Sequence, residues 1–434
     1  MTSLISLGFM YVVLVSTCIV VHVVKQGSEY ILFSCYVFFA LYAYFYQKRY
    51  YAPFVVGLWV LTPFIRRYVD YYTGYDPASL IILSPYMVSL IGLYSVLPRL
   101  LKTNMKYAVI VVVVITYFFV GVFVNGIFSA LWDFFGYIAP ISFSLWIILY
   151  LRGQSISVLV NSILILSIIV SVYAIFQFFF LPSWDAMWMI RSEMMSIGLP
   201  EPTSVRVFSM MNSPAVLASF LTLGIALSLG FGKGGYNISL FFLVVLMTSV
   251  RVSWGVAFIL FLSYSLFSRK IISSFFIVLL GAFLILSIND FLPREISELI
   301  SNRLESIENI SDDHSMNERL YLYQSVVNQL TVYGQGFGSV GASSGENIDS
   351  GYLELFINFG IFGGCLYIIY FLFLLMKAFV LVGFNRLSIP VVFGSLVVPI
   401  SVFDSYMYGP YGCFHFLAIA IAISYILTER KYED

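Results

Sequence analysis

The sequence predicts an all-α polytopic membrane protein with about 12–14 transmembrane helices. Hydrophobic residues make up 61% of the chain, charged residues only 10%, and the mean hydropathy is +0.95. Long apolar runs recur along the chain, and a hydrocarbon core of about 30 Å needs about 20 apolar residues per helical span. Charged residues are also sorted between alternate loops, as expected when these loops face opposite sides of a membrane.

The apolar runs predict up to fourteen spans in order along the chain. The first run has neither a basic leader nor a small-residue cleavage site, so we expect a retained span and not a signal peptide. The two short spans on either side of Arg251 are alternatively one broken hairpin, and one of the adjacent spans five and six is alternatively re-entrant. The predicted spans are residues 3–24, 29–47, 51–65, 79–98, 107–127, 130–151, 156–181, 213–231, 236–249, 252–268, 271–289, 350–376, 388–404 and 411–428.

The basic residues favour an orientation with both termini in the cytoplasm. Threading the spans in this way places thirteen Lys and Arg residues inside and nine outside, and seven of the eight Lys residues are inside. Positive charge on short loops favours the cytoplasmic side. The basic residues on the outer side are therefore almost all Arg, which indicates that they are needed there.

Two polar stretches, residues 182–212 and 290–349, are predicted outer-side loops of a single transmembrane domain that covers residues 1–434. The first ends at Ser213 and Pro214, which suit the N-cap and the first turn of the next span. The second is predicted to form two short amphipathic helices, because apolar residues recur at helical spacing and Ser315 with Glu318 forms a capping box.

A glycine-rich sequence, GQGFGSVG, follows these two helices. It superficially matches a dinucleotide-binding fingerprint, but no strand–helix–strand unit surrounds it, so we reject that interpretation. We expect a tight, irregular segment that lines a cavity, since irregular backbone at membrane depth is tolerated only when protein or water covers it.

Composition also excludes several classes of function. The formal net charge is +0, so nothing predicts a nucleic acid partner. The four cysteines form no CxxC motif and predict neither a metal site nor a disulfide framework. We therefore expect no cofactor and no metal.

The outer arginines are the first candidate site residues: Arg66, Arg67, Arg206 and Arg251. The guanidinium fork fits phosphate oxygens, which predicts an anion site. Snorkelling at the interface is the alternative for Arg66 and Arg67, and a weak surface ion pair is the alternative for Arg206. A charge at the depth of Arg251 costs about 2.5 kcal/mol or more, so it needs a partner or a cavity.

Candidates for acid–base chemistry lie further along the chain. His314 in the second polar loop is either a general base or a solvated loop residue. Asp349 and Glu354 lie at the mouth of the span 350–376, where a carboxylate suits acid–base work, although Asp349 also stands where a helix N-cap is expected. Asp404 is a weaker candidate.

The order of these motifs resembles a known family. RVFSMMNSP opens one span, TSVRVSW separates two short spans, SMNER lies in the polar loop, and YGQGFGS precedes DSGYLELFINFGIFG at the next span. Over residues 200–365 this order resembles the O-antigen polymerase and ligase superfamily, and specifically the Wzy-type polysaccharide polymerases. The resemblance implies a GT-C-like helical glycosyltransferase of the bacterial inner membrane, with periplasmic loops and no metal.

The resemblance implies a site as well. Arg206, Arg251 and Arg319 match the family arginines, and Asp349 stands where ligases of the superfamily carry a His, which favours a polymerase. The catalytic candidates are therefore Asp349, His314 and Arg319. The predicted ligands of the substrate pyrophosphate are Arg66, Arg67, Arg206 and Arg251, with Tyr352 shaping the sugar site.

The implied function is polymerisation of undecaprenyl-pyrophosphate-linked oligosaccharide repeat units at the periplasmic face, in lipopolysaccharide or other polysaccharide biosynthesis. The lipid bilayer and a protein that regulates chain length are expected partners. Two alternatives stay open: an O-antigen ligase, and a flippase or transporter of lipid-linked oligosaccharides. Transporters usually show internal repeats, and none is evident here.

Overall fold

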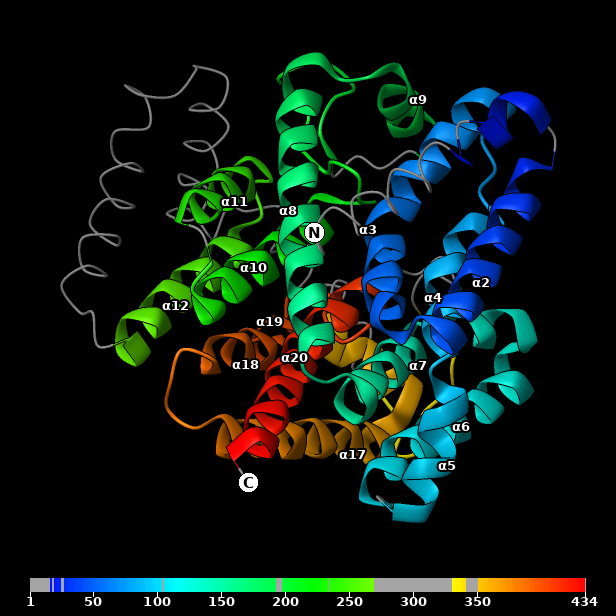
Figure 1. The fold of residues 1–434 in the computed structure, drawn as a ribbon. Coiled ribbons are helices and arrows are strands. Elements are labelled where there is room, and N and C mark those ends of the chain that lie inside the picture. The colour runs from blue at the N-terminus through cyan, green and yellow to red at the C-terminus, as the bar shows by residue number, and fades with distance from the viewer. Residues whose placement is uncertain are drawn as a thin grey trace, which may run out of the picture. The chain divides into compact units, whose positions relative to one another are not determined.

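The computed structural model describes residues 16–17, 19–24, 27–103, 105–192, 197–233, 235–268, 330–340 and 350–433 (Figure 1). Most of the predicted span 3–24, all of the span 271–289 and both predicted amphipathic helices lie outside these residues. Within them the chain is helical, with no β-strand. This confirms the all-α prediction for the described part of the chain.

Nine helices in the described ranges are long and apolar enough to cross a membrane, as expected of a polytopic membrane protein. Two shorter apolar helices match the predicted spans 236–249 and 388–404. The predicted span 51–65 lies within a longer helix that is not among the nine, because that helix carries charged residues at both ends. The nine helices cover Ser28–Tyr46, Leu80–Lys102, Ala108–Asn125, Ile127–Tyr150, Gln154–Phe180, Pro214–Phe231, Arg251–Ser268, Gly351–Val382 and Gly409–Glu429.

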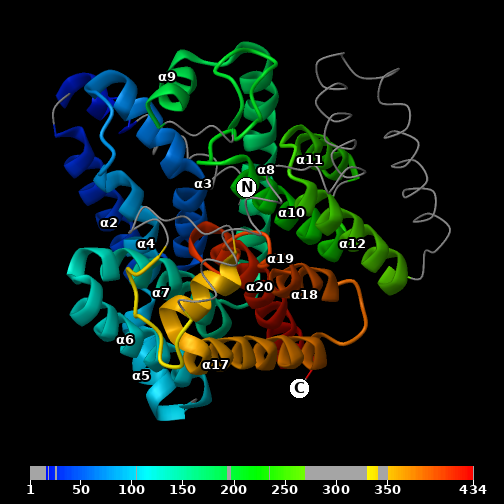
Figure 2. The same cartoon turned by 180° about the vertical axis from the view of Figure 1, so that it is seen from behind.

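The chain divides into two compact units, each built from segments that are separate in sequence. The first unit holds residues 1–91, 151–301 and 427–434. Its α3 packs against α2, α4, α8 and α9, and its α10 packs against α8, α11 and α12 (Figure 2). Its elements are α2 (Ser28–Tyr46), α3 (Lys48–Thr73), η1 (Leu80–Leu83), α4 (Ser84–Leu90), α8 (Gln154–Phe180), α9 (Ser183–Ser192), α10 (Pro214–Phe231), α11 (Gly235–Met247) and α12 (Arg251–Ser268).

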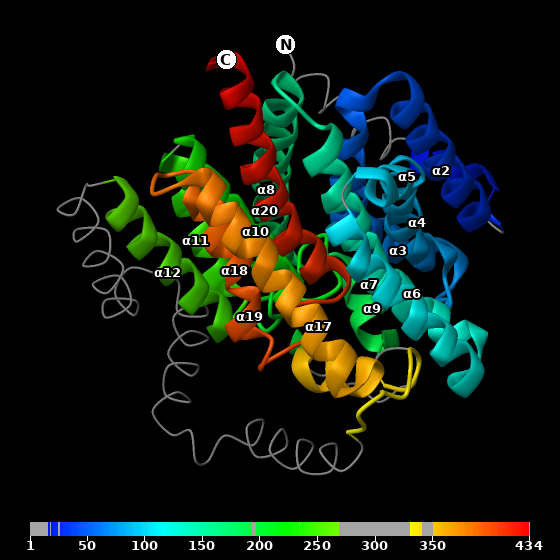
Figure 3. The ribbon, with the colours of Figure 1, turned by 90° about the horizontal axis from the view of Figure 1, so that it is seen from below.

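The second unit holds residues 92–150 and 302–426. Figure 3 shows its α6 and α7 side by side, joined by a turn at Gly126, whose φ of 88° favours glycine. Its elements are α5 (Leu93–Thr103), α6 (Met105–Asn125), α7 (Ile127–Tyr150), α17 (Gly351–Val382), α18 (Ser388–Ser395), α19 (Val397–Ile400) and most of α20 (Gly409–Glu433).

Local signals in the sequence set several helix ends. The side chain of Ser213 accepts a hydrogen bond from the backbone N–H of Val216, and Pro214 occupies the first turn of α10. This confirms the predicted cap. At α17 the N-cap position is occupied by Ser350, whose side chain makes no capping hydrogen bond. The candidate cap Asp349 lies outside the described residues.

Helix α17 is broken at Gly360, which has φ 65° and ψ 175°. In an unbroken helix the N–H groups of Ile361 and Phe362 would bond the carbonyls four residues earlier, at Ile357 and Asn358. Instead, these N–H groups donate to the carbonyls of residues 331 and 332, at 3.1 and 3.2 Å. The freed carbonyls accept from the N–H groups of residues 335 and 336, at 2.9 and 3.0 Å. Residues 331–336, which we call the strap, thus replace the hydrogen bonds that the helix loses.

The strap is the start of the glycine-rich sequence, and its glycines allow close backbone contact. Gly334 and Gly336 both have φ 76°, and a Cβ on either would collide with the backbone of Gly360 or Gly121, respectively. Asn125 Nδ2 donates to the carbonyls of residues 335 and 337, each at 3.0 Å. The backbone is irregular here, as predicted: residues 336–338 are buried, whereas Val332 and Tyr333 are 56% and 79% exposed. That this segment lines a cavity stays a prediction.

We predict that Gly336→Ala destabilises the protein, because alanine at this left-handed φ is strained and its Cβ meets the Gly121 backbone. Strain of this kind costs about 1–3 kcal/mol, so thermal unfolding in detergent should shift several degrees lower. The matched control is Gly255→Ala in α12, where a Cβ meets nothing within 4 Å. Equal melting of the two variants would contradict the packing described here.

Candidate functional site

Among the predicted site residues that the structure describes, Arg67 is the most buried. It lies near the C-terminal end of α3, and its side chain is 0% exposed. Its Nε donates to Asp185 Oδ1 at 2.7 Å, Nη1 donates to the Met211 carbonyl at 2.6 Å, and Nη2 donates to the Ser209 carbonyl. The guanidinium carbon also lies 4.8 Å from the centre of the Phe208 ring. Arg67 therefore ties α9 and the segment 205–213 to α3.

Asp185, in α9, is the carboxylate partner of Arg67. Its second oxygen accepts hydrogen bonds from Tyr173 at 2.9 Å and from Gln177 at 2.7 Å. Gln177 in turn accepts, through Oε1, the backbone N–H groups of Phe208 at 3.0 Å and Ser209 at 2.7 Å. A buried ion pair is retained at low cost only when further hydrogen bonds satisfy it, and this pair is satisfied on both sides. The network holds Ser209 at φ 53°, a left-handed conformation that is unfavourable for serine.

The segment that Arg67 holds also carries Arg206. The backbone N–H of Arg206 donates to the Ile197 carbonyl at 2.9 Å, which fixes the start of the segment. Its side chain donates to the carbonyls of Thr248 at 3.3 Å and Ser249 at 3.4 Å, in the linker between α11 and α12. Arg206 is thus placed against the chain just before Arg251.

Arg251 is the first residue of α12 and is partly exposed, as is Arg206. The N-terminus of a helix carries partial positive charge, so an arginine there adds to an already positive end. Such an end stabilises an anion. The structure therefore brings Arg206 next to the linker that leads into Arg251, and Arg67 holds the carbonyls of Ser209 and Met211 in the segment that follows Arg206.

Arg66 lies in a different setting from Arg67, since neighbouring residues on a helix point about 100° apart. Its Nη2 donates to the Asp76 carbonyl at 2.7 Å, its Nε lies 3.3 Å from Asp70 Oδ2, and its guanidinium carbon lies 5.6 Å from the centre of the Tyr75 ring. Carboxylates surround it. The predicted Arg66–Arg67 pair is therefore divided between two environments.

Asp70 is buried beyond the apolar part of α3. Burial raises its pKa from 3.8 to about 6, and the neighbouring carboxylate of Glu29 acts in the same direction, whereas the Arg66 guanidinium lowers it. Neither carboxylate oxygen accepts a hydrogen bond from the part of the chain that the structure describes. Asp70 thus takes up a proton near neutral pH.

Tyr352 lies in the first turn of α17, in the second unit. Its hydroxyl donates to the Val398 carbonyl at 2.6 Å, and its ring stacks on Phe356 with the centroids 6.5 Å apart. Two residues further on, Glu354 is 4% exposed and accepts a hydrogen bond from Ser405 Oγ. The side chain of Tyr352 thus links the first turn of α17 to α19, the short helix that follows α18.

Asp133 is a buried carboxylate near Glu354 that the sequence analysis missed. It lies in α7, is 0% exposed and accepts the backbone N–H of Gly338 at 2.8 Å. The sequence did contain a signal for Asp133, because it is the one acidic residue within the apolar run 130–151. A charged residue inside a membrane span indicates a structural or functional role. Asp185 offered no such signal, since it lies in a polar loop far from Arg67 in sequence.

The three predicted catalytic residues, Asp349, His314 and Arg319, lie outside the described residues. Their roles stay predictions. Among the residues that the structure places, no group of three His, Cys, Asp or Glu side chains could hold a metal ion.

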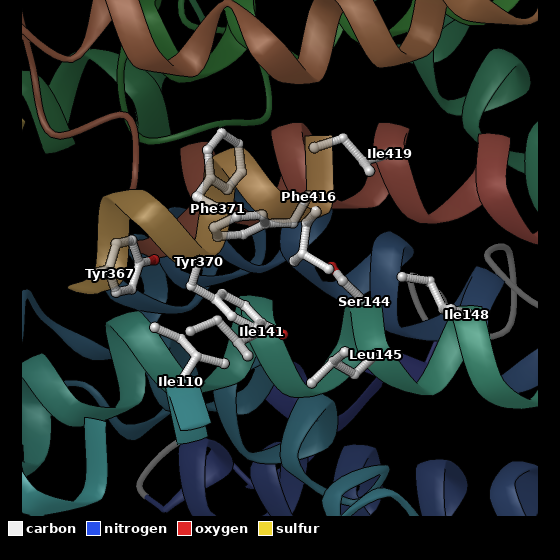
Figure 4. A pocket seen from close by; sticks show the side chains of 11 residues that line it. Ile110, Ile141, Ser144, Leu145, Ile148, Tyr367, Tyr370, Phe371, Phe416 and Ile419 are labelled. Atoms are coloured by element: carbon white, nitrogen blue, oxygen red, sulfur yellow. The ribbon is translucent and has the colours of Figure 1, made fainter. Parts of the chain in front are cut away.

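A small apolar cavity lies between α6, α7, α17 and α20 (Figure 4). Its volume is about 30 Å³, enough for about two water molecules and too small for a sugar. Aliphatic and aromatic side chains line it, and only Ser144, Tyr367 and Tyr370 among them carry a hydroxyl group. We assign it to packing and not to substrate binding.

We compared the chain with models of protein families, with curated proteins and with solved structures, and found no match in any of the three. The interpretation of the site therefore depends on its geometry and on the sequence pattern.

We predict that Arg67→Ala lowers stability and not only activity, because it leaves Asp185 buried without its cation. Removing one partner of a buried ion pair costs about 3–5 kcal/mol, which should appear as a large drop in melting temperature in detergent. Arg191→Ala is the matched control, since Arg191 is an exposed arginine on α9. A variant at Arg67 that melts like the wild type but loses activity would instead make Arg67 a direct substrate ligand.

We also predict a pH dependence from Asp70. Because its folded pKa is raised to about 6, its favourable contribution to folding is complete at pH below 3.8 and is lost as the pH rises through about 6. Between pH 5 and pH 7.5 the melting temperature of the wild type should therefore fall more than that of Asp70→Asn. Glu201→Gln, at an exposed carboxylate, should follow the wild type. Parallel curves for the wild type and Asp70→Asn would overturn this assignment.

Proposed function

We propose that the protein joins lipid-pyrophosphate-linked glycan repeat units into a polymer. The observation that carries this proposal is the position of Arg206 against the linker before Arg251, at the N-terminal end of α12. Two arginines and a helix N-terminus together favour a strongly charged anion such as pyrophosphate. The setting, a multi-pass helical protein with apolar spans, suits a substrate that is anchored in lipid.

The reaction transfers a glycan from one lipid carrier to the sugar of another unit. A hydroxyl of the incoming unit attacks the anomeric carbon of the growing glycan, and a new glycosidic bond forms. The bond between that carbon and the pyrophosphate oxygen breaks, and the lipid pyrophosphate leaves with both electrons. The hydroxyl proton passes to a general base.

The arginines would act on the leaving group. As that bond breaks, negative charge grows on the pyrophosphate, and fixed cations stabilise it most strongly where water is excluded. Arg206 and Arg251 take this role, with Arg319 as a third cation. Arg67 acts as a positioning residue, since the protein already engages its guanidinium and its side chain is fully buried. Asp349 and His314 remain the candidates for the base.

The finer expectations also belong to this proposal. They are a GT-C-like arrangement of the helices, undecaprenyl as the lipid, the bacterial inner membrane with both termini in the cytoplasm, and periplasmic loops 182–212 and 290–349. A separate protein would regulate chain length. The charge sorting along the sequence supports the orientation, because the outer basic residues are nearly all arginines.

The experiment that tests the proposal uses purified protein in detergent, its lipid-pyrophosphate-linked repeat unit and EDTA, with products separated on a gel. A ladder of lengthening glycans is expected. An intact lipid-linked unit with no ladder would oppose the proposal and favour a ligase that needs another acceptor, or a transporter.

We predict that Arg206→Ala and Arg251→Ala each lower the polymerisation rate by about 10²–10³-fold, as expected when one group that stabilises transition-state charge is removed. Lysine at either position should recover part of the rate, because it keeps the charge but loses the bidentate fork. Melting temperatures should stay close to the wild type, since both side chains are partly exposed. Arg191→Ala serves as the control, and a comparable loss of rate in that variant would argue against a specific anion site.

A further inference from the structure

A second cavity lies in the first unit, where the N-terminal end of α2 meets the loop that follows α3. Its volume is about 330 Å³, at the lower end of the roughly 300–1,000 Å³ that is typical of ligand sites. Polar and aromatic side chains share its wall: Glu29, Tyr30, Thr73, Tyr75 and Asp76. The function proposed above does not use this cavity.

The walls of the cavity are held in place by the protein. Glu29 Oε2 accepts hydrogen bonds from Ser79 Oγ at 2.8 Å and from the backbone N–H of Leu80 at 3.2 Å. On the opposite wall, Arg66 donates to the Asp76 carbonyl, and the Arg66 guanidinium covers the Tyr75 ring. The Asp76 carboxylate also accepts the backbone N–H of Ala78 at 2.9 Å. The site is therefore formed before a ligand arrives, which lowers the cost of binding.

The charge of the wall excludes a phosphate group. Glu29 and Asp76 lie on the surface of the cavity, and both carboxylates are close enough to buried Asp70 to raise its pKa. Arg66 is the one cation among these contacts. An anion would meet net repulsion here, whereas a ligand with several hydroxyl groups would donate hydrogen bonds to the carboxylates.

Aromatic rings also gather in the last turns of α3, just before Thr73 and Tyr75 of the cavity wall in sequence. Tyr68 contacts Tyr72 and Trp184, with ring centroids 4.9 and 5.9 Å apart, and Tyr71 contacts Trp184 at 6.5 Å. Tyr71 and Tyr72 are 41% and 46% exposed. Flat rings offer apolar faces to the C–H groups of a sugar, and the nearby carboxylates offer acceptors to its hydroxyls.

We propose that this cavity binds a neutral sugar or an amino sugar of the glycan chain, apart from the arginines that face the pyrophosphate. The inference rests on the proposed function for the identity of the chain, but sugar binding itself requires no transfer reaction. The cavity takes one sugar ring, and the tyrosines beside it contact the next ring. It rejects uronic acids, because their carboxylate would meet Glu29 and Asp76.

The test is saturation-transfer NMR on the full-length protein in nanodiscs. The probes are methyl glycosides of glucose, galactose, mannose, N-acetylglucosamine and N-acetylgalactosamine, with methyl glucuronide as the charged probe. We expect signal for at least one neutral glycoside and none for the glucuronide. Asp76→Asn should weaken that binding about tenfold or more, which is the effect of losing one charge-assisted hydrogen bond. Inorganic pyrophosphate should not displace the glycoside.

Tyr75→Leu, which removes a ring from the wall, should weaken binding as well, and Glu201→Gln at an exposed carboxylate elsewhere should not. The inference fails if no neutral glycoside binds, if methyl glucuronide binds equally well, or if Asp76→Asn and Tyr75→Leu bind like the wild type. The outcomes of this binding test can be distinguished from those of the gel assay. Glycoside binding without a polymer ladder would refute the proposed function alone, whereas a ladder with unchanged binding in both variants would refute this inference alone.

Discussion

A polar group of the backbone in an apolar interior needs a hydrogen-bond partner within the protein. Two irregular segments of this structure meet that requirement. In the first unit, carbonyls at residues 209 and 211 accept from Arg67, and the N–H groups at 208 and 209 donate to Gln177. In the second unit, the strap and the broken helix α17 exchange four hydrogen bonds. Irregular backbone is thus stable where side chains or another backbone segment supply its missing hydrogen bonds. Candidate functional residues lie on or beside these segments.

The same requirement gives the four arginines Arg66, Arg67, Arg206 and Arg251 different roles. A guanidinium that is wholly enclosed and bonded at all three nitrogens, as at Arg67, fixes a loop and cannot also receive a bulky ligand without leaving its partners. Arg206 and Arg251 remain partly exposed on the frame that Arg67 fixes. Arg66 stands among carboxylates, and there its charge offsets theirs. The four arginines thus differ in setting: Arg67 is an enclosed anchor, Arg66 lies beside a carboxylate, and Arg206 and Arg251 are the partly exposed pair to which we assign the proposed anion site.

Sequence reasoning recovered what local signals encode. The helix predicted at 156–181 is found at Gln154–Phe180, and the cap at Ser213 is present because serine followed by proline defines a helix start by itself. Contacts across the chain were not recoverable. Arg67 and Asp185 are 118 residues apart, and Asp133 and Gly338 are 205 apart, so no period or spacing connects them. The candidate site was thus predictable as a set of residue types, whereas the division of labour within it was not.

The strap has a consequence for how α17 is aimed. Because the helix is interrupted at Gly360, its two halves are not one continuous rod, and the hydrogen bonds that join them pass through residues 331–336. The strap therefore sets the angle of the N-terminal part of α17, which carries Tyr352 and Glu354, relative to the part that follows Gly360. A shift of one residue in the hydrogen-bond register of the strap would reorient the part of α17 before Gly360 without any change in the sequence of that part. The orientation of the first turns of α17 thus depends on residues that lie 15 to 20 positions before the helix begins.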